Sequence, residues 1–234
     1  MKRIISPSYQ YNQKTVIREW VLNFISTKNI HSFLDIGAGF PQTALHFKNA
    51  VATYLAVERD RGKAKVLKDL GIGVIAHSFP CSIAGSYDLV LTAHSIPENG
   101  TQYPFFFKKA YELVSPNGYL VIITFKGVCD AMSQIRAELR NTEVLPFEQN
   151  KFNQLMSVLK MLGRPNIDTI TSMETSSNLD DIVKTVYVSL NDREEKHINK
   201  IRAIIKSKFT TIDGYHLPHD HNIIVIQKQQ LQLG

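Results

Sequence analysis

Cysteine is scarce in this chain, which has only two among 234 residues. Cys81 and Cys129 stand far apart, without the paired spacing of metal ligands, so the sequence indicates no disulfide framework and no cysteine-based metal site. We therefore expect a reduced, cytoplasmic setting. Apolar runs of membrane-spanning length are also missing, and the basic N-terminus lacks the apolar core of a signal peptide. These absences favour a globular protein with no membrane partner.

A concentrated block of charge of one sign is missing too. The formal net charge is +6, and the basic residues are scattered along the chain. Such a balance permits an anionic partner such as RNA without requiring one. The length suits one domain that buries a full core without disulfides, so we expect a single domain over residues 1–234.

Strand-like apolar runs alternate with helical stretches along most of the chain. Runs such as Leu120–Ile123 are apolar on both faces. This alternation is typical of an α/β fold in which a parallel sheet is covered by helices on both faces. The expected strands are 32–36, 52–58, 72–76, 87–92, 118–125, 167–173 and 221–227. The expected helices are 13–26, 41–49, 60–70, 102–114, 129–140, 148–162, 178–190 and 192–207, and a turn is expected at 114–118.

The stretch Phe33–Phe40 (FLDIGAGF) carries the clearest functional signal. An apolar strand runs into a turn with two glycines, Gly37 and Gly39, and the next strand ends at Glu58. Glycine lets the backbone take a positive φ and approach a ligand closely. A carboxylate at the tip of the next strand can accept hydrogen bonds from both hydroxyls of a ribose. The pattern therefore predicts a nucleoside-binding turn.

The residues around this turn argue against a pyrophosphate ligand. A dinucleotide fingerprint needs a third glycine, and Gln42 stands at its place, preceded by Pro41. Asp35, at the mouth of the turn, would repel a pyrophosphate and would attract an ammonium or sulfonium group. A nicotinamide-dependent dehydrogenase is therefore disfavoured.

The acid, the two glycines and the downstream acid resemble motif I of the class I methyltransferases that use S-adenosylmethionine. The resemblance extends to the order of elements over nearly the whole chain. It implies a doubly wound, mostly parallel sheet of seven strands in the order 3-2-1-4-5-7-6, with the last strand antiparallel and helices on both faces. It also implies an N-terminal helical cap or lid at 1–30 and substrate-shaping helices within 126–220. Tyr9 and Tyr11 would either close over the cofactor or belong to a mobile arm.

The same resemblance assigns the cofactor contacts. Asp35, Gly37, Ala38 and Gly39 would line the methionine end of S-adenosylmethionine, and Glu58 would bind the ribose diol. Arg59, beside Glu58, is also a candidate cofactor contact, and the alternative for this pair is a solvated ion pair.

At the adenine the chain departs from the family pattern, because no carboxylate follows the third strand. Ser78 and Phe79 are the candidates there, with Phe79 equally well explained as a core residue.

By the same resemblance, the loop after the fourth strand would lie under the methyl-bearing sulfur, where Ala93 and His94 are candidate cofactor contacts, and it would also face the methyl acceptor. Ala93 and His94 begin this loop, and His94 is the candidate catalytic base because an imidazole titrates near neutral pH. The alternative is a histidine that only packs on the cofactor, and Glu98 is a weaker candidate for the base. An amine or thiol acceptor needs no strong base, because the sulfonium already activates the methyl group.

Histidines near the C-terminus suggest a metal site, which we do not expect. His216, His219 and His221 lie close together in the sequence, but we expect them in a loop and at the start of a strand, where the last two would point to opposite faces.

The resulting hypothesis is a methyltransferase that uses S-adenosylmethionine, yields S-adenosylhomocysteine and methylates O or N of a small molecule. The alternatives are an RNA methyltransferase and a non-catalytic binding protein that retains the fold.

Overall fold

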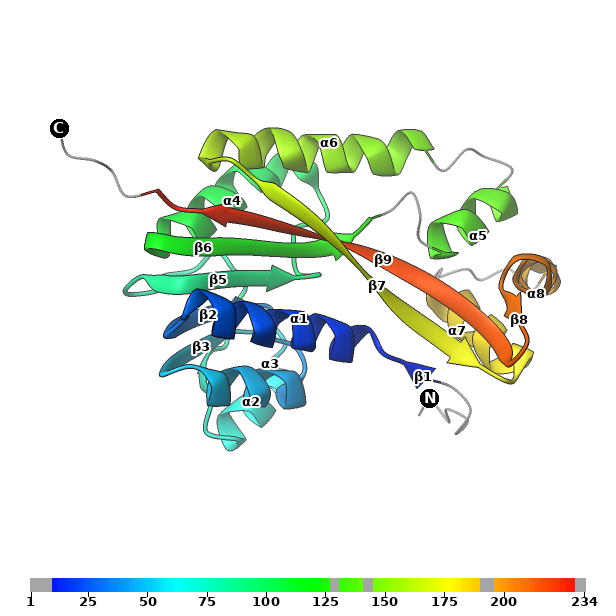
Figure 1. The fold of residues 1–234 in the computed structure, drawn as a ribbon, viewed down its shortest axis with the longest axis horizontal. Coiled ribbons are helices and arrows are strands. Elements are labelled where there is room, and N and C mark those ends of the chain that lie inside the picture. The colour runs from blue at the N-terminus through cyan, green and yellow to red at the C-terminus, as the bar shows by residue number, and fades with distance from the viewer. Residues whose placement is uncertain (1–9, 127–130, 141–144, 190–195, 230–234) are drawn as a thin grey trace. The chain divides into compact units, whose positions relative to one another are not determined.

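The computed structural model describes residues 10–126, 131–140, 145–189 and 196–229, and its elements are labelled in Figure 1. The chain forms two compact units. Unit 1 comprises residues 1–16, 125–150 and 170–221, and unit 2 comprises residues 17–124, 151–169 and 222–234. The expected boundaries of one domain, a cap at 1–30 and an insertion at 126–220 stay predictions, and Tyr9 lies outside the described residues.

Unit 2 contains a parallel sheet that alternates with helices. Strand β2 pairs in parallel with β3 on one side and with β5 on the other, and β4 and β6 extend the sheet from these neighbours. The strands are β2 (Ser32–Ile36), β3 (Thr53–Val57), β4 (Gly73–Ile75), β5 (Tyr87–Ala93) and β6 (Val114–Phe125). The helices are α1 (Gln13–Lys28), α2 (Pro41–Ala50), α3 (Arg61–Asp69), η1 (Gly100–Gln102), α4 (Tyr103–Glu112) and α6 (Leu145–Leu162).

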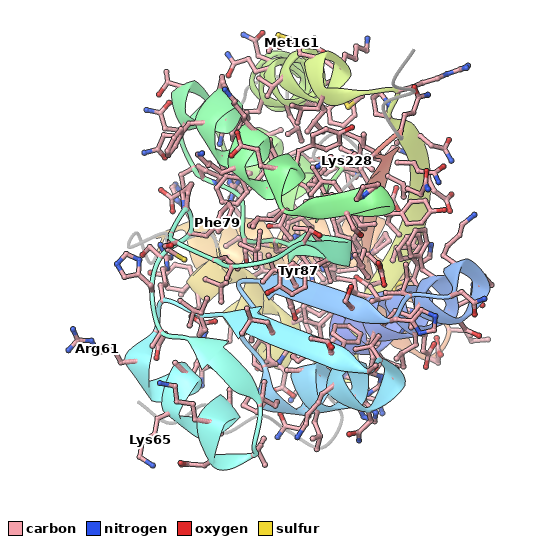
Figure 2. All side chains as sticks on the ribbon, turned by 90° about the vertical axis from the view of Figure 1, so that its left-hand side faces the viewer. Arg61, Lys65, Phe79, Tyr87, Met161 and Lys228 are labelled. Carbon is pink, nitrogen blue, oxygen red and sulfur yellow. The ribbon has the colours of Figure 1, made fainter. Side chains whose placement is uncertain are left out.

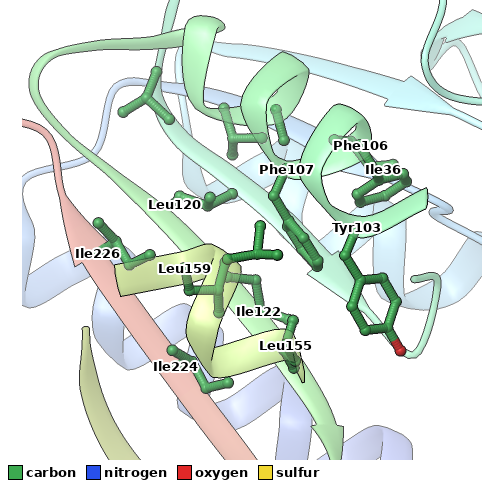
Figure 3. Packing of buried hydrophobic residues seen from close by; sticks show 14 of the residues in the cluster. Ile36, Tyr103, Phe106, Phe107, Leu120, Ile122, Leu155, Leu159, Ile224 and Ile226 are labelled. Atoms are coloured by element: carbon green, nitrogen blue, oxygen red, sulfur yellow. The ribbon is translucent and has the colours of Figure 1, made fainter. Parts of the chain in front are cut away.

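Helices cover both faces of this sheet, as the sequence predicts. On one face, α4 and α6 pack on the strands through Phe107 and Leu159, which are fully buried (Figure 3). On the other face, Phe33 of β2 contacts Phe47 of α2, and a small cluster joins α2, β3 and α3. Because side chains alternate along a strand, Asp35 shares the face of Phe33. The alternation therefore places Asp35 on the side of α2.

The expected turn at 114–118 is wrong. The segment 114–118 is not a free turn, because β6 already begins at Val114, which pairs with Tyr87. The register then shifts, so that Leu89 pairs with Tyr119, and Asn117 takes a φ of 64°. The turn-forming Pro-Asn-Gly sequence is thus accommodated as an irregularity inside a strand.

Among its described residues, unit 1 contains two long strands, two short strands and three helices. The strands are β1 (Gln10–Tyr11), β7 (Asn166–Ser176), β8 (Thr210–Thr211) and β9 (Gly214–Gln227), where β7 and β9 are shared with unit 2. The helices are α5 (Ala131–Arg140), α7 (Leu179–Ser189) and α8 (Lys196–Lys208). Their core joins residues such as Ile135, Val186 and Ile205 to Leu217 of β9. β9 thus begins seven residues before the expected start of the last strand, and the predicted loop at His216–His221 is wrong.

The strand order is β4-β3-β2-β5-β6-β9-β7-β1, with β8 paired to β9. The expected count of seven is wrong, because β1 adds an edge strand and β8 a short partner. β9 runs antiparallel to β6, since Lys228 exchanges hydrogen bonds with Asn117 and Gly118 while the N–H of Lys126 donates to Asp220. Among the described residues, no helix has the length and apolar character needed to cross a membrane.

Candidate active site

The candidate residues of unit 2 gather where β2 and β5 end. From β2 the chain proceeds to β3 and β4 on one side, and then returns to β5 on the other side of β2. This reversal is the topological switch point of an open parallel sheet, where loops leave in opposite directions and ligands commonly bind. The turn after β2 contains Gly37 and Gly39, and the loop after β5 contains His94 and Ser95.

The two glycines of the turn have different surroundings. Gly37 has a φ of 81° and donates its N–H to Val57 O over 2.8 Å. A Cβ at this position would lie 2.4 Å from the Cβ of Ser95, so the missing side chain lets the loop after β5 approach. Gly39 has a φ of 57°, and a Cβ there would meet only Gly37 O, at 3.6 Å. The backbone around Gly39 thus leaves space that a ligand can use.

Glu58 is anchored at the tip of β3. It is 6% exposed, and its Oε2 accepts from the N–H of Gly39 over 2.9 Å while Oε1 accepts from Asp60 over 2.8 Å. Each oxygen of an ionised carboxylate retains a further lone pair after one such bond. The carboxylate is therefore oriented against the glycine turn and can still accept from two hydroxyls. Arg59 is exposed.

Asp35 is the second acid of the site, and it is 4% exposed. The hydroxyl of Tyr54 donates to its Oδ2 over 2.7 Å. Burial raises the pKa of Asp35 to about 7, the bond from Tyr54 opposes this rise, and the charge of Glu58 adds to it. At neutral pH the site therefore holds a carboxyl group close to its titration midpoint, which a ligand cation would drive to the ionised form.

The start of α2 is poorly equipped to bind an anion. Pro41 lies in its first turn, and the N-cap residue Phe40 makes no side-chain capping bond. Proline has no N–H, so one of the donors that a helix N-terminus would offer to a phosphate is missing. This agrees with the sequence-based argument against a pyrophosphate.

His94 has a strained backbone. Its φ is 54°, and its N–H donates to Ile123 O over 2.9 Å. Residues other than glycine seldom adopt this conformation, and when they do they are concentrated at functional sites. His94 and Ala93 are both half-buried.

At the expected adenine end, Phe79 is half-buried and contacts Phe106 edge-to-face at 5.0 Å between ring centroids. It also packs against the buried cluster beneath α4, so the core role considered for Phe79 is present. Ser78 is exposed, and its backbone oxygen lies 2.8 Å from Nδ1 of His77. The cofactor roles assigned to the site residues stay predictions.

Sequence reasoning missed three residues of this region. Tyr54 of β3 donates to Asp35 of the adjacent strand β2 along a diagonal, because the residue directly opposite Asp35 is Ala56. The hydroxyl of Ser95 lies 3.4 Å from Gly37 O, although the two residues are 58 positions apart in the sequence. Thr92 is fully buried, and its Oγ1 finds no hydrogen-bond partner in the part of the chain that the structure describes. Only Thr92 had a sequence signal, namely a hydroxyl in an apolar strand.

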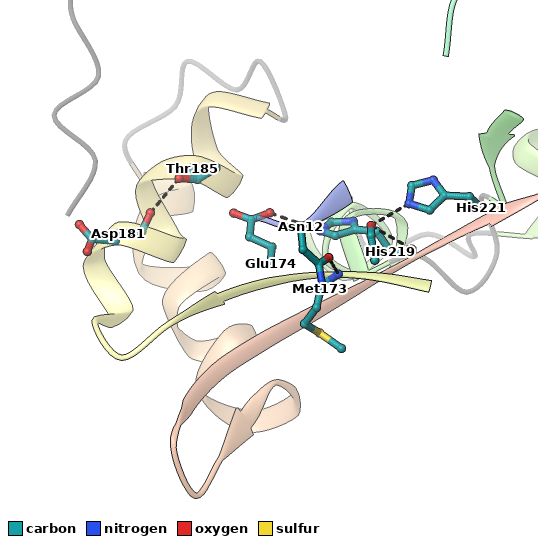
Figure 4. A network of polar contacts seen from close by, with 8 residues as sticks. Asn12, Met173, Glu174, Asp181, Thr185, His219 and His221 are labelled. Carbon is teal, nitrogen blue, oxygen red and sulfur yellow. Dashed lines mark hydrogen bonds and ion pairs between the residues drawn. The ribbon is translucent and has the colours of Figure 1, made fainter. Parts of the chain in front are cut away.

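His219 and His221 of unit 1 belong to a buried polar network (Figure 4). His221 Nε2 lies 2.7 Å from Ser172 Oγ, and His219 Nε2 lies 3.3 Å from Glu174 Oε2. The side chains of both histidines therefore contact side chains of β7. The expectation that they point to opposite faces is wrong, because residues two apart on a strand share a face. Within the described residues, no three His, Cys, Asp or Glu side chains form a group that could hold a metal ion.

Tyr11 lies in unit 1 as part of β1. It pairs with Glu174 of β7, and its ring lies 5.3 Å from that of His219. The next residue, Asn12, accepts from the N–H of Met173 over 2.7 Å (Figure 4). The structure thus places Tyr11 in an edge strand, which neither alternative anticipated, and the role as a lid over the cofactor stays a prediction.

Comparison with known proteins bears on the fold. No family model matches the sequence, and no curated protein matches it. Solved structures match most of the chain. A Bacillus halodurans protein, provisionally described as a methyltransferase, is 15% identical and superposes with a TM-score of 0.57, covering 90% of this chain and 98% of its own.

Two further solved structures extend this likeness. Precorrin-6y C5,15-methyltransferase from Geobacter metallireducens is 11% identical with a TM-score of 0.50, covering 92% of this chain and 88% of its own. The mycolic acid cyclopropane synthase CmaA1, solved with S-adenosylhomocysteine, is 13% identical with a TM-score of 0.52, covering 90% of this chain and 84% of its own. The strand order and these likenesses together show that the chain has the class I methyltransferase fold.

Proposed function

We propose that this protein is an S-adenosylmethionine-dependent methyltransferase that acts on an oxygen or nitrogen atom of a small molecule. One observation carries the proposal: two buried acids, Asp35 and Glu58, flank a two-glycine turn at the switch point of the sheet. Glu58 is bound to the turn itself through Gly39. The likeness in fold to methyltransferases supports the same function.

The residues present fit S-adenosylmethionine. The open space around Gly39 suits close contact of the backbone with a ligand, and the lone pairs that remain on Glu58 suit the two ribose hydroxyls. Asp35 suits the ammonium group, because a nearby cation stabilises the ionised form of a buried carboxyl group. When bound, the cofactor supplies a methyl group already activated by the sulfonium charge. The contribution of the protein is then to hold the acceptor in line with that methyl group.

His94 is the candidate to contact the acceptor. Its place after β5 and its strained backbone support this role. For a hydroxyl acceptor, its imidazole would accept the proton, and for an amine it would orient the lone pair.

Calorimetric titration with S-adenosylmethionine and S-adenosylhomocysteine tests the proposal. We expect both to bind the wild type, and we expect Asp35→Ala and Glu58→Ala to weaken binding. Asp69→Ala, on the exposed side of α3, is the control and should bind as the wild type does. Failure of both ligands to bind, or equal binding by all variants, would overturn the proposal. Methyl transfer to any acceptor would eliminate the alternative of a non-catalytic binding protein.

One observation favours RNA as a second class of acceptor. The exposed side of α3 is basic, and Arg61 and Lys65 project outward from it (Figure 2). Beside it, Phe40 is 47% exposed, and Lys63 Nζ lies 5.8 Å from the centroid of its ring. An exposed aromatic ring among basic side chains is a common arrangement in single-strand nucleic-acid binding.

Charge reversal separates this second candidate from the first. If RNA is the acceptor, Arg61→Glu with Lys63→Glu should weaken binding of a single-stranded RNA oligonucleotide, measured by fluorescence anisotropy at low salt. The control pair, Lys184→Glu with Lys206→Glu in unit 1, changes the net charge equally and should bind as the wild type does. Equal losses in both pairs would indicate nonspecific attraction and would count against RNA.

A further inference from the structure

Tyr54 is held in a fixed position beside Asp35. Its ring stands edge-on to Phe33, at 5.2 Å between centroids and 84° between planes. Its hydroxyl then donates to Asp35 Oδ2 over 2.7 Å. Because Phe33 and Asp35 lie on the same face of β2, the strand pairing sets both contacts at once. The direction of the hydroxyl is thus defined by the fold.

The other neighbours of Asp35 offer little polar support. In register with it are Ala56 on β3 and Leu91 on β5, both apolar and buried. The titratable groups that act on Asp35 are Tyr54 and Glu58, one within β3 and one directly after it. Of these two, only Tyr54 stabilises the ionised form. An acid in such surroundings depends on that one hydroxyl bond for both its orientation and its charge.

We propose that Tyr54 is a positioning residue for cofactor binding: its hydroxyl orients the Asp35 carboxyl group and favours the ionised form that receives the ammonium group of S-adenosylmethionine. The inference rests on the proposed function, because it assigns the cation to that cofactor. Tyr54 itself need not contact the ligand. Its effect passes through the bond to Asp35.

The titration behaviour of the pair agrees with this role. Burial raises the pKa of Tyr54 far above its usual value, and the neighbouring Asp35 raises it further, so Tyr54 remains a donor throughout the neutral range. Burial raises the pKa of Asp35 to about 7 even though Tyr54 lowers it. Only the ionised carboxyl attracts an ammonium group, so cofactor affinity should rise with pH and level off above about pH 7.

Removing the hydroxyl should move this pH profile. In Tyr54→Phe, the ionised form of Asp35 loses a donor, and a charge-assisted hydrogen bond corresponds to a shift of about one pH unit. The variant should then bind S-adenosylmethionine about tenfold more weakly at pH 6, but less than about twofold more weakly at pH 8. Calorimetric titrations of both proteins between pH 5.5 and 8 measure this difference, and comparison at equal pH cancels the titration of the ligand.

A matched control separates an effect on Asp35 from a general effect of losing a tyrosine hydroxyl on stability. Tyr87 is another tyrosine of unit 2 whose hydroxyl donates a hydrogen bond, in its case to Ala84 O over 3.2 Å. Tyr87→Phe should leave the pH profile of binding unchanged. A loss in Tyr54→Phe that is equal at every pH, or no loss at all, would overturn the inference.

A readout without the ligand keeps this inference distinct from the proposed function. In the ligand-free protein, the carboxyl carbon of Asp35 can be titrated by NMR, and its midpoint should rise in Tyr54→Phe and stay unchanged in Tyr87→Phe. An unchanged midpoint in Tyr54→Phe contradicts the role of Tyr54. If the midpoint moves and S-adenosylmethionine does not bind, the proposed function fails, and the cofactor assignment fails with it.

Discussion

Gly37 and Gly85 show how one backbone conformation can serve different ends. Both have a positive φ, of 81° and 86°. A Cβ on Gly37 would collide with the side chain of Ser95, whereas a Cβ on Gly85 would meet nothing within 4 Å. A requirement for glycine can therefore come from the backbone alone or from the backbone together with a close neighbour.

Gly37→Ala should be strongly destabilising, because it adds the collision with Ser95 to the strain of a positive φ. We expect a loss of about 2–4 kcal/mol in the free energy of unfolding, measured by denaturant titration. Gly85→Ala is the control and should lose only about 1 kcal/mol. Combining Gly37→Ala with Ser95→Gly should recover part of the loss. Equal losses for the two single variants would contradict the role of Ser95.

Thr92 carries a buried hydroxyl that finds no partner within the described part of the chain. Thr92→Val keeps the branched shape and removes the desolvated group, so we expect a gain of about 1 kcal/mol in stability. For a protein of this size, the thermal midpoint should rise by about 2–4 °C. Ser32→Ala is the contrasting variant, because the Ser32 hydroxyl accepts from the N–H of Asp88 and its removal should destabilise. A fall in the midpoint of Thr92→Val would contradict this account.

Among the residues of the candidate site, the sequence predicted those that lie close together along the chain. It missed those whose contacts depend on the order of the strands. Asp35, Gly39 and Glu58 lie along one strand–turn–helix–strand unit, so their meeting follows from the element pattern. The contact of Ser95 with Gly37 requires β2 and β5 to be neighbours. Tyr54 additionally requires the register of β2 with β3, which no periodicity in the sequence specifies.

At the scale of elements, Asp88 connects three strands. Its Oδ2 accepts from the N–H groups of His31 and Ser32 at the start of β2, and its Oδ1 accepts from the hydroxyl of Ser115 in the irregular part of β6. Burial raises the pKa of Asp88, but these hydrogen bonds together outweigh burial and hold it below its usual value. A single side chain in β5 thus fixes the starts of both neighbouring strands.

Asp88→Asn should loosen this junction, because an amide has one acceptor oxygen where the carboxylate has two. We expect a loss of about 1–2 kcal/mol at neutral pH, measured by urea unfolding. Since the folded pKa lies below the unfolded value, the contribution of Asp88 is present above the unfolded pKa and is lost as the pH falls through the folded pKa. The difference between wild type and variant should therefore shrink below about pH 4. A difference that is constant with pH would contradict this origin.

Sequence periodicity also gave the elements of unit 2 nearly as the structure has them, because doubly apolar strands and amphipathic helices leave few alternatives. It failed at 114–118 and at the start of β9. In both segments, proline and asparagine or histidine suggested a loop, yet each segment belongs to a strand that pairs with a neighbour, and β6 accommodates Asn117 as a local irregularity. Pairing of this kind overrides local preference.

At the scale of the whole molecule, Asp35 lowers stability at the pH where the proposed function needs it. The pKa of Asp35 is raised to about 7 in the folded state, chiefly by burial. An acid whose folded pKa exceeds its unfolded value binds more protons when folded, so stability falls as the pH rises from about 4 to about 7. The full difference is on the order of 4 kcal/mol.

Asp35→Asn removes this cost while preserving an acceptor for Tyr54. We expect the variant to have a higher thermal midpoint than the wild type at pH 7.5, and expect this advantage to diminish toward pH 4. Scanning calorimetry across this range measures both effects, and S-adenosylmethionine should bind the variant more weakly than the wild type at pH 7.5. A variant that is less stable than the wild type at pH 7.5 would show that the charge of Asp35 is not the source of the cost.

The two hydrogen bonds that Glu58 accepts from Gly39 and Asp60 have a consequence for the kinetics of binding. A carboxylate fixed in this way has lost its rotational freedom during folding, so an arriving ligand need not restrict it again. Association should then proceed without a slow rearrangement of the turn, and affinity should be governed by how long the ligand stays.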